Sequence, residues 1–342
     1  MDIKTAIKKL TSRQHLSAEE MTAVMRDIMS GNTTDAQNAA FLIGLQMKGV
    51  QVEELLGGAI VMRELVTPVT LNNTDNLVDT CGTGGSGSNK FNVSTASALV
   101  AACAGAHVAK HGNRGASSKS GSADVLEAAG VNLALSPDQV AESIDKVGVG
   151  FMFAPAHHSA MKHVITARKE IGVRTVFNLL GPLTNPAGAP NQVMGVFDQD
   201  WIEPLLKVFK QLGSQHVLVV SSDDGLDEIS TSAPSRVGEL KDGEINIYRL
   251  SPEDFSIPLQ ADYAALQINS VEESLALLRK ALAGEHQPGG DIVALNAGAA
   301  IYAAGLAASL GDGVKQAQEI IASGAGVAKL EELASFTKAK AG

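Results

Sequence analysis

The chain has 342 residues, of which 45% are hydrophobic, and a formal net charge of −10. This length leaves room for two domains, and the acidic balance disfavours a nucleic-acid partner, because nucleic-acid phosphates attract basic proteins. No stretch is apolar for long enough to span a bilayer, and the first residues lack the apolar core of a signal peptide, so we expect no membrane partner.

Residues 1–72 are predicted to form a helical domain. Ser17-Ala18-Glu19-Glu20 is a capping box that begins one helix, and Thr34-Asp35-Ala36-Gln37 begins a second in the same way. A third helix is predicted over residues 52–65. Three small residues in the second helix allow close packing, either within the chain or between two subunits: Ala39, Ala40 and Gly44.

From residue 77 onward, predicted strands alternate with predicted helices, which is typical of a largely parallel sheet. The predicted strands cover residues 77–79, 107–110, 149–153, 193–197 and 216–220, and the predicted helices cover 94–104, 123–129, 137–146 and 201–212. Residues 237–250 predict an antiparallel hairpin that turns at Asp242-Gly243. The C-terminal third is otherwise predicted to be helical, with a buried segment over 294–308.

A second helical stretch interrupts this alternation. Residues 158–180 read as helix rather than strand, and we expect the chain to return to the helical domain over about 158–188. The predicted fold is therefore α/β, with a small helical N-terminal domain and a larger α/β domain that has a mostly parallel central sheet. The α/β domain is expected over residues 73–157 and 189–342.

A glycine-rich loop follows the first predicted strand and contains Gly82, Gly84, Gly85 and Gly87. Glycine adopts left-handed backbone conformations freely and lets a ligand approach the main chain. Ser94-Thr95 is predicted to cap the next helix, and a loop that leads into a helix N-terminus is a typical phosphate site. Cys81 in this loop reads as a small buried residue. Neither it nor Cys103 has metal or redox spacing, so a reducing, cytoplasmic compartment is expected.

Residues 80–123 contain no Asp or Glu, although the chain is acidic overall. The glycines match the dinucleotide fingerprint formally, but the acidic residue that should follow is absent. A highly phosphorylated ligand explains both the glycines and the acid-free segment. Residues 110–114 follow a strand at the expected carboxyl edge of the sheet, and the serine-rich residues 117–122 are a second predicted phosphate cradle.

Two further groups of residues have chemical potential. Residues 222–228 place four carboxylates on one loop, where they repel one another unless a cation neutralises them. An exposed acidic turn is the ordinary interpretation, whereas the position after a strand favours a magnesium ion (Mg2+) that serves a polyphosphate. By spacing alone, His157 and His158, with Arg168 downstream, read as capping or core residues.

Five blocks of sequence closely resemble the anthranilate phosphoribosyltransferases of tryptophan biosynthesis. These blocks are Gly82-Thr83-Gly84-Gly85, residues 91–95, residues 110–114, residues 174–178 with 181–186, and Asp227-Glu228. The resemblance implies a fold like that of nucleoside phosphorylases and a homodimer formed through the helical domain. It also implies transfer of the phosphoribosyl group of phosphoribosyl pyrophosphate to the amino group of anthranilate, with release of pyrophosphate.

The resemblance assigns residues to each ligand. Phosphoribosyl pyrophosphate is expected at Gly82, Gly85, Ser86, Lys90, Asn92, Val93, Ser94, Thr95, Lys110, His111, Gly112, Asn113, Arg114, Gly115, Ala116, Ser117, Ser118 and Ser122. Anthranilate is expected at Gly82, Asn113, His158, Arg168 and Gly181, and Mg2+ at Ser94, Asp227 and Glu228. Lys110, Asn113 and Arg168 are expected to stabilise the transition state, and no residue is assigned as a general base.

The sequence departs from the family pattern at three positions. Ser86 stands where an Asp is usual, Lys90 where a small hydroxyl residue is usual, and Ser159 where a proline is common. The first two make the loop more positive, so we expect less dependence on a second metal ion. Two alternatives are a pyrimidine nucleoside phosphorylase, whose glycine and lysine motifs are not found here, and a non-catalytic nucleic-acid-binding relative.

Overall fold

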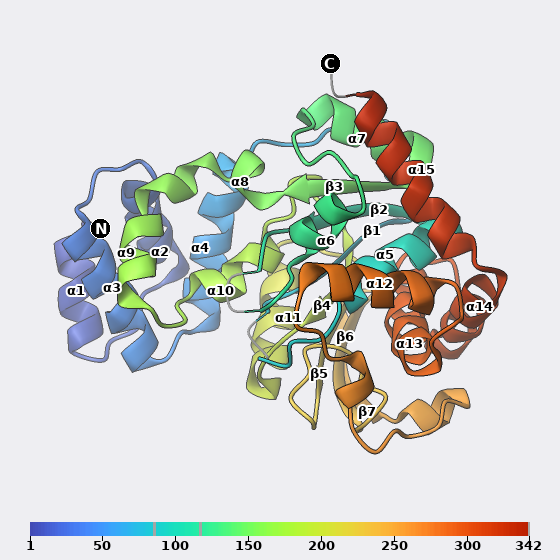
Figure 1. The fold of residues 1–342 in the computed structure, drawn as a ribbon. Coiled ribbons are helices and arrows are strands. Elements are labelled where there is room, and N and C mark those ends of the chain that lie inside the picture. The colour runs from blue at the N-terminus through green and yellow to red at the C-terminus, as the bar shows by residue number, and fades with distance from the viewer. Residues whose placement is uncertain (85–86, 116–117, 341–342) are drawn as a thin grey trace.

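The computed structural model describes residues 1–84, 87–115 and 118–340. A helical domain lies beside a larger α/β domain that is built on one central sheet (Figure 1). The predicted fold class is therefore confirmed. Within these described ranges, no helix is long and apolar enough to cross a membrane.

The N-terminal domain contains the predicted helices and one more before them. Both predicted capping boxes are present: Ser17 Oγ accepts from the Glu20 N–H, and Thr34 Oγ1 accepts from the Gln37 N–H. Gly44 packs inside the chain, because a Cβ placed there would lie 3.1 Å from Leu10 Cβ. The helices are α1 (Ile3–Thr11), α2 (Ala18–Met29), α3 (Asp35–Lys48) and α4 (Val52–Leu65).

After the third strand, the chain packs again against this domain. Val164 and Leu180 of the returning segment belong to the same apolar cluster as Met21 and Leu42, and Asn38 Nδ2 donates to the His163 carbonyl at 3.1 Å. The predicted boundary residues between the domains stay a prediction. The segment contains α8 (Ala154–His157), η1 (Ser159–His163), α9 (Ile165–Ile171), α10 (Phe177–Leu180) and η2 (Gly181–Leu183).

The sheet has seven strands in the order β3-β2-β1-β4-β5-β6-β7. The first five are parallel, and β5, β6 and β7 pair antiparallel. The predicted hairpin is confirmed: Asp242 and Gly243 both have positive φ, which a tight two-residue turn requires. The strands are β1 (Leu77–Gly82), β2 (His107–Gly112), β3 (Val149–Phe153), β4 (Asn191–Gly195), β5 (His216–Ser222), β6 (Ser235–Lys241) and β7 (Glu244–Leu250).

Alternating side chains bury both faces of the sheet. Val193 of β4 faces the cluster that contains most helices of the α/β domain, whereas Met194 faces the cluster shared with the helical domain. The remaining helices are α5 (Val93–Cys103), α6 (Ser122–Ala128), α7 (Pro137–Val147), α11 (Ile202–Gln211), α12 (Val271–Leu282), α13 (Gln287–Ala303), α14 (Leu310–Ser323) and α15 (Ala325–Ala339), with short turns η3 (Gln199–Trp201), η4 (Pro252–Phe255) and η5 (Ala264–Leu266).

The predicted start of α5 is wrong. The helix begins at Val93, so Ser94 and Thr95 lie inside its first turn and do not cap it. Asn92 occupies the cap position, but its side chain is held elsewhere: its Oδ1 accepts from the hydroxyls of Ser120 at 2.8 Å and Ser274 at 2.7 Å. These contacts fix how the chain enters α5.

The topology positions a ligand site between β1 and β4. The chain runs from β1 to β2 and β3 on one side, and from β4 to β5 on the other. In open α/β sheets, ligands bind at the carboxyl ends of the strands where the order reverses in this way. Gly82 and Gly195 are paired at that edge.

Candidate active site

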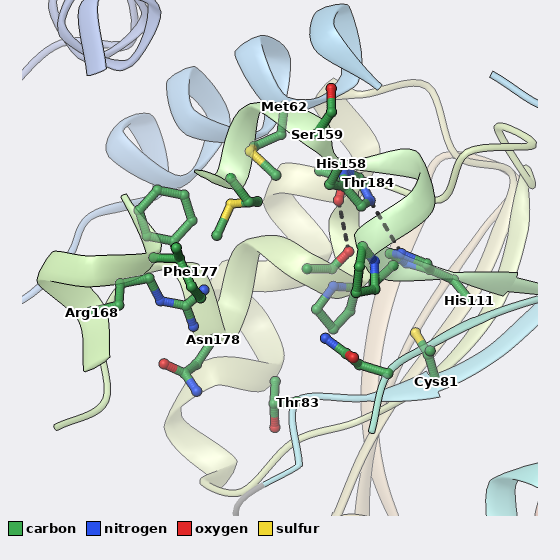
Figure 2. Close-up of a pocket in the computed structure, with 18 of the residues that line it drawn as sticks. Met62, Cys81, Thr83, His111, His158, Ser159, Arg168, Phe177, Asn178 and Thr184 are labelled. Atoms are coloured by element: carbon green, nitrogen blue, oxygen red, sulfur yellow. Dashed lines mark hydrogen bonds between the residues drawn. The ribbon is translucent and has the colours of Figure 1, made fainter. Parts of the chain in front are cut away.

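A pocket of about 480 Å³ lies where the helical domain meets the carboxyl ends of β1 and β2. Both domains contribute to its wall: Met62 comes from α4 and Arg168 from α9, whereas Cys81 and His111 come from the sheet (Figure 2). The residues predicted to bind anthranilate all line it: Gly82, Asn113, His158, Arg168 and Gly181.

Arg168 provides a cation in this pocket. Its guanidinium lies over the Phe177 ring, 5.1 Å from the ring centroid, and burial lowers its pKa. No carboxylate of the described chain lies within ion-pair distance of it. The guanidinium can therefore pair with the carboxylate of a ligand.

Two histidines form the opposite side of the pocket (Figure 2). His111 Nε2 and His158 Nε2 are 3.2 Å apart, so one of them donates to the other. Burial, and then the neighbouring histidines, lower the pKa of His111 to about 3 and that of His158 to about 4. Both rings are therefore neutral at pH 7.

Asp79 organises this side of the site, although sequence analysis gave it no role. Its Oδ1 accepts from the backbone N–H of His111 at 3.1 Å, and its Oδ2 accepts from Asn185 Nδ2 at 2.8 Å. Burial raises its pKa, and attraction to Lys110 opposes that shift. A carboxylate at the end of a predicted buried strand is the signal that could have identified it, because such a group needs partners.

The start of α5 and Lys110 form a polar region on the other side of β1. Lys110 is buried, and its Nζ donates to the Thr80 carbonyl at 2.5 Å and to Ser94 Oγ at 3.2 Å. Burial lowers its pKa. Thr95 Oγ1 is also buried, and among the described atoms it has no hydrogen-bond partner. A buried hydroxyl of this kind is a binding position for a ligand oxygen.

The predicted basic segment and serine run pack against each other. Ser122 Oγ donates to the Asn113 carbonyl at 3.3 Å, and Ser118 Oγ donates to the Ser120 carbonyl at 3.2 Å. Gly112 permits this approach, because a Cβ there would lie 2.3 Å from Ser122 Oγ. The predicted Gly85, Ser86, Ala116 and Ser117 lie outside the described residues.

Arg114 directs its guanidinium away from this region. It pairs with Asp124 at 3.0 Å and Glu127 at 2.7 Å on α6. The Gly115 N–H is likewise used by Asp124, at 2.9 Å. The structure therefore does not place the charge of Arg114 with the other predicted phosphate-binding side chains.

The four carboxylates of the predicted acidic loop separate into two pairs. Asp223 forms an ion pair with Arg249, and Asp224 accepts from Ser230 at 2.6 Å, from Ser232 at 2.8 Å and from the Ser222 hydroxyl. These two carboxylates have structural partners. Asp227 instead lies beside the paired ends of β1 and β4, where a Cβ on Gly82 would be 3.2 Å from its Oδ2.

The cation between Asp227 and Glu228 is the ammonium of Lys90. Its Nζ lies 2.7 Å from Asp227 Oδ1 and 2.7 Å from Glu228 Oε2. Burial acts to lower the pKa of Lys90, but both carboxylates outweigh it and the pKa is raised. Burial, and then repulsion from Asp227, act to raise the pKa of Glu228, and attraction to Lys90 opposes that shift.

A metal site at these carboxylates stays a prediction. Ser94 and Asp227 line a second cavity of only about 20 Å³, and Asp227 and Glu228 already hold Lys90. Among residues 1–84, 87–115 and 118–340, no group of three or more His, Cys, Asp or Glu side chains could hold a metal ion. The two carboxylates fit one cation. With the Lys90 ammonium in place, they do not fit a resident metal ion in addition.

Comparisons with known proteins agree with this geometry. Residues 4–66 match the helical bundle domain of the glycosyl transferase family, and residues 74–327 match the a/b domain of that family. The chain is 58% identical to the anthranilate phosphoribosyltransferase of Thioalkalivibrio sulfidiphilus, over 98% of this chain and 99% of the relative. It is 57% identical to that of Saccharophagus degradans, over 98% and 99%.

Solved structures give the same result. The crystal structure of anthranilate phosphoribosyltransferase from Thermus thermophilus matches with a TM-score of 0.91 and 44% identity, over 97% of this chain and 99% of that one. The Saccharomyces cerevisiae enzyme in complex with PRPP and Mg has the same fold, with a TM-score of 0.89 and 24% identity over 98% of both chains. These relatives support the transferase interpretation and not the two alternatives. The chain belongs to the anthranilate phosphoribosyltransferase family.

Proposed function

We propose that the pocket between the two domains is where this protein carries out the reaction of its family. That reaction transfers the phosphoribosyl group of phosphoribosyl pyrophosphate to the amino group of anthranilate and releases pyrophosphate. The observation that carries the proposal is Arg168, a cation without an ion-pair partner in the described chain, in one pocket with Asn113 and Gly82. Anthranilate has the carboxylate that such a guanidinium binds.

Phosphoribosyl pyrophosphate binds along the carboxyl ends of β1 and β2. Lys110, Ser94 and the unpartnered hydroxyl of Thr95 lie together at the start of α5, where the helix dipole favours negative charge. The other predicted contacts come from the glycine loop and residues 111–122. Gly82 and Asn113 belong to both substrate sets, so the two substrates meet beside them.

The chemistry follows from where charge develops. Breaking the bond from ribose C1 to pyrophosphate leaves positive charge on the sugar and negative charge on the leaving group. Lys110 and the N–H groups at the start of α5 stabilise the leaving group. The anthranilate amine is already a nucleophile, so Arg168 and Asn113 act by holding it in position, and no general base is assigned.

Mg2+ is proposed as a requirement of the reaction, which the yeast relative solved with PRPP and Mg supports. An ion that enters with the pyrophosphate group belongs to the substrate. Ser94 and Asp227 are the predicted protein ligands that remain adjacent to a cavity. A metal held by Asp227 and Glu228 takes no part in these steps, because Lys90 lies between the two carboxylates.

The protein is further proposed to be a cytoplasmic homodimer that associates through its helical domain. Ala40 and Met47 are seven residues apart, on one side of α3, and both are exposed, Met47 at 76%. Cys81 and Cys103 are both free thiols, as a reducing compartment would keep them. Light scattering of the wild type and of Met47→Lys tests the dimer: a wild-type monomer would contradict it.

A coupled assay tests the reaction itself. The protein is mixed with anthranilate, phosphoribosyl pyrophosphate and Mg2+, and the loss of anthranilate fluorescence is followed. We expect a loss that requires all three additions, and no fluorescence loss would contradict the proposal. Incubation with thymidine and phosphate tests the phosphorylase alternative, and a salt-dependent DNA titration tests the nucleic-acid-binding alternative.

A further inference from the structure

Lys90 is held firmly at the acidic loop. Besides its contacts of 2.7 Å with each carboxylate, its Nζ lies 3.2 Å from Ser88 Oγ, and only 10% of its side chain is exposed. Its backbone forms an antiparallel bridge with Gln267. The ammonium therefore lies in a buried polar position and does not extend into solvent.

The carboxylates are also fixed in place. Gly195 at the end of β4 lies so close to the acidic loop that a Cβ there would be 1.7 Å from the Asp227 carbonyl oxygen. The Asp227 backbone therefore packs directly against the end of β4, and this contact also restricts the position of the adjacent Glu228. Two adjacent carboxylates at such a position require a cation, since burial makes unpaired charge costly.

A lysine ammonium and a divalent ion compete for these oxygens. Both are hard cations that carboxylate oxygens bind, but both cannot lie within about 3 Å of the same two oxygens, because like charges at that separation repel strongly. The lysine has the advantage of being part of the chain, so it is always present at the site.

We propose that Lys90 is a built-in cation that closes the Asp227–Glu228 pair to divalent metal ions in the protein without substrate. The positive charge beside these carboxylates then comes from the chain and not from a bound ion. The proposal rests on the proposed function only in placing this pair near the substrate pyrophosphate. The sequence-based expectation is a smaller dependence on a second metal ion. The proposal attributes that smaller dependence to the contact between Lys90 and Asp227, which are 137 residues apart in the chain.

The test is a titration with Mn2+ alone, followed by the electron paramagnetic resonance signal of the free ion, with no substrate present. The wild type is expected to show no saturable site that depends on Asp227. Lys90→Thr is expected to gain one saturable site, which binds Mn2+ about tenfold or more tighter than any binding that the wild type shows over the same range. Adding Asp227→Asn to that variant should abolish the new site.

Lys119→Thr is the matched control. Lys119 lies in the same acid-free segment and is exposed, so this change removes the same charge without freeing the carboxylates, and its Mn2+ binding should equal that of the wild type. A wild-type site that Asp227→Asn removes would overturn the proposal, as would a Lys90→Thr variant that binds no better than the control. If Lys90→Thr does not fold, the wild type and Asp227→Asn alone decide. Because no substrate is used, the result does not depend on the transferase assay.

Discussion

Arg168 and Lys90 are both cations at the site, yet the chain uses their charges differently. The guanidinium of Arg168 lies over an aromatic ring and has no ion-pair partner among the described carboxylates. The ammonium of Lys90 is enclosed by two carboxylates of the chain itself. The difference shows that a basic residue near a pocket marks a ligand only where the protein leaves its charge uncompensated.

The largest expected effect is on stability at the acidic loop. Changing Asp227→Asn with Glu228→Gln removes the two carboxylates that enclose the buried Lys90 ammonium, so we expect the free energy of unfolding to fall by about 3–5 kcal/mol. Turnover should fall severely as well. Chemical denaturation measures the first and the fluorescence assay the second.

Asp223→Asn is the control for this change. Asp223 and Arg249 form a surface ion pair, with 40% and 54% of their side chains exposed. Loss of this ion pair should lower the free energy of unfolding by about 0–1 kcal/mol. Sequence analysis had treated Asp223 and Asp224 alike, but Asp224 accepts from several serine hydroxyls and is not a neutral comparison. Equal losses from the two experiments would show a diffuse acidic loop.

Arg168→Ala should primarily affect anthranilate. Losing a charged hydrogen bond costs about 1.5–3 kcal/mol, which corresponds to a rise in the anthranilate KM of about 10- to 150-fold. Steady-state kinetics with each substrate varied in turn will measure it. Arg26→Ala, which removes a surface arginine paired with Glu64, should leave both constants unchanged. A change confined to the phosphoribosyl pyrophosphate KM would show that the assignment is wrong.

The neutral histidine pair predicts a dependence of stability on pH. In the folded protein the pKa of His158 is lowered from 6.5 to about 4, so between these two values only the unfolded chain takes up its proton, and stability falls as pH falls. In His158→Gln, we expect the free energy of unfolding to fall by about 1–3 kcal/mol less than in the wild type as the pH is lowered through this range. Denaturant midpoints across this pH range measure it, with His107→Gln as the control for a lost histidine. An unchanged slope would contradict the neutral pair.

The smallest effect is expected at Thr95. Because its buried hydroxyl has no hydrogen-bond partner in the described chain, Thr95→Val should leave stability unchanged or raise it by about 0–1 kcal/mol. The same change should weaken phosphoribosyl pyrophosphate binding by about 0.5–1.5 kcal/mol, if the hydroxyl meets a ligand oxygen. Isothermal titration of that substrate, beside thermal unfolding, separates the two effects. A clear loss of stability would reveal a structural partner.

Sequence reasoning succeeded where the physics is local. Capping boxes, the Asp242-Gly243 turn and the strand periodicity involve neighbours of a few residues, and all are found in the structure. The start of α5 was wrong because Asn92 is held by Ser120 and Ser274, which are distant in sequence.

Contacts between distant segments set most of the site's electrostatics. His111 and His158 are 47 residues apart, and Lys90 and Asp227 are 137 apart. The residue types at these positions were visible in the sequence, but their pairing was not. Family resemblance brought the acceptor residues together as a set, whereas periodicity alone read His158 as a core or capping residue.

The apolar cluster shared by the sheet and the helical domain has a consequence for how the protein unfolds. Met25 of α2, Leu180 of the returning segment, and Met194 and Val219 of the strands share one continuous core. Neither domain can lose its structure without exposing the apolar surface of the other to water. We therefore expect the two to melt as one cooperative unit, with a single calorimetric peak, and a fragment that lacks residues 1–66 to aggregate through the uncovered face of its sheet.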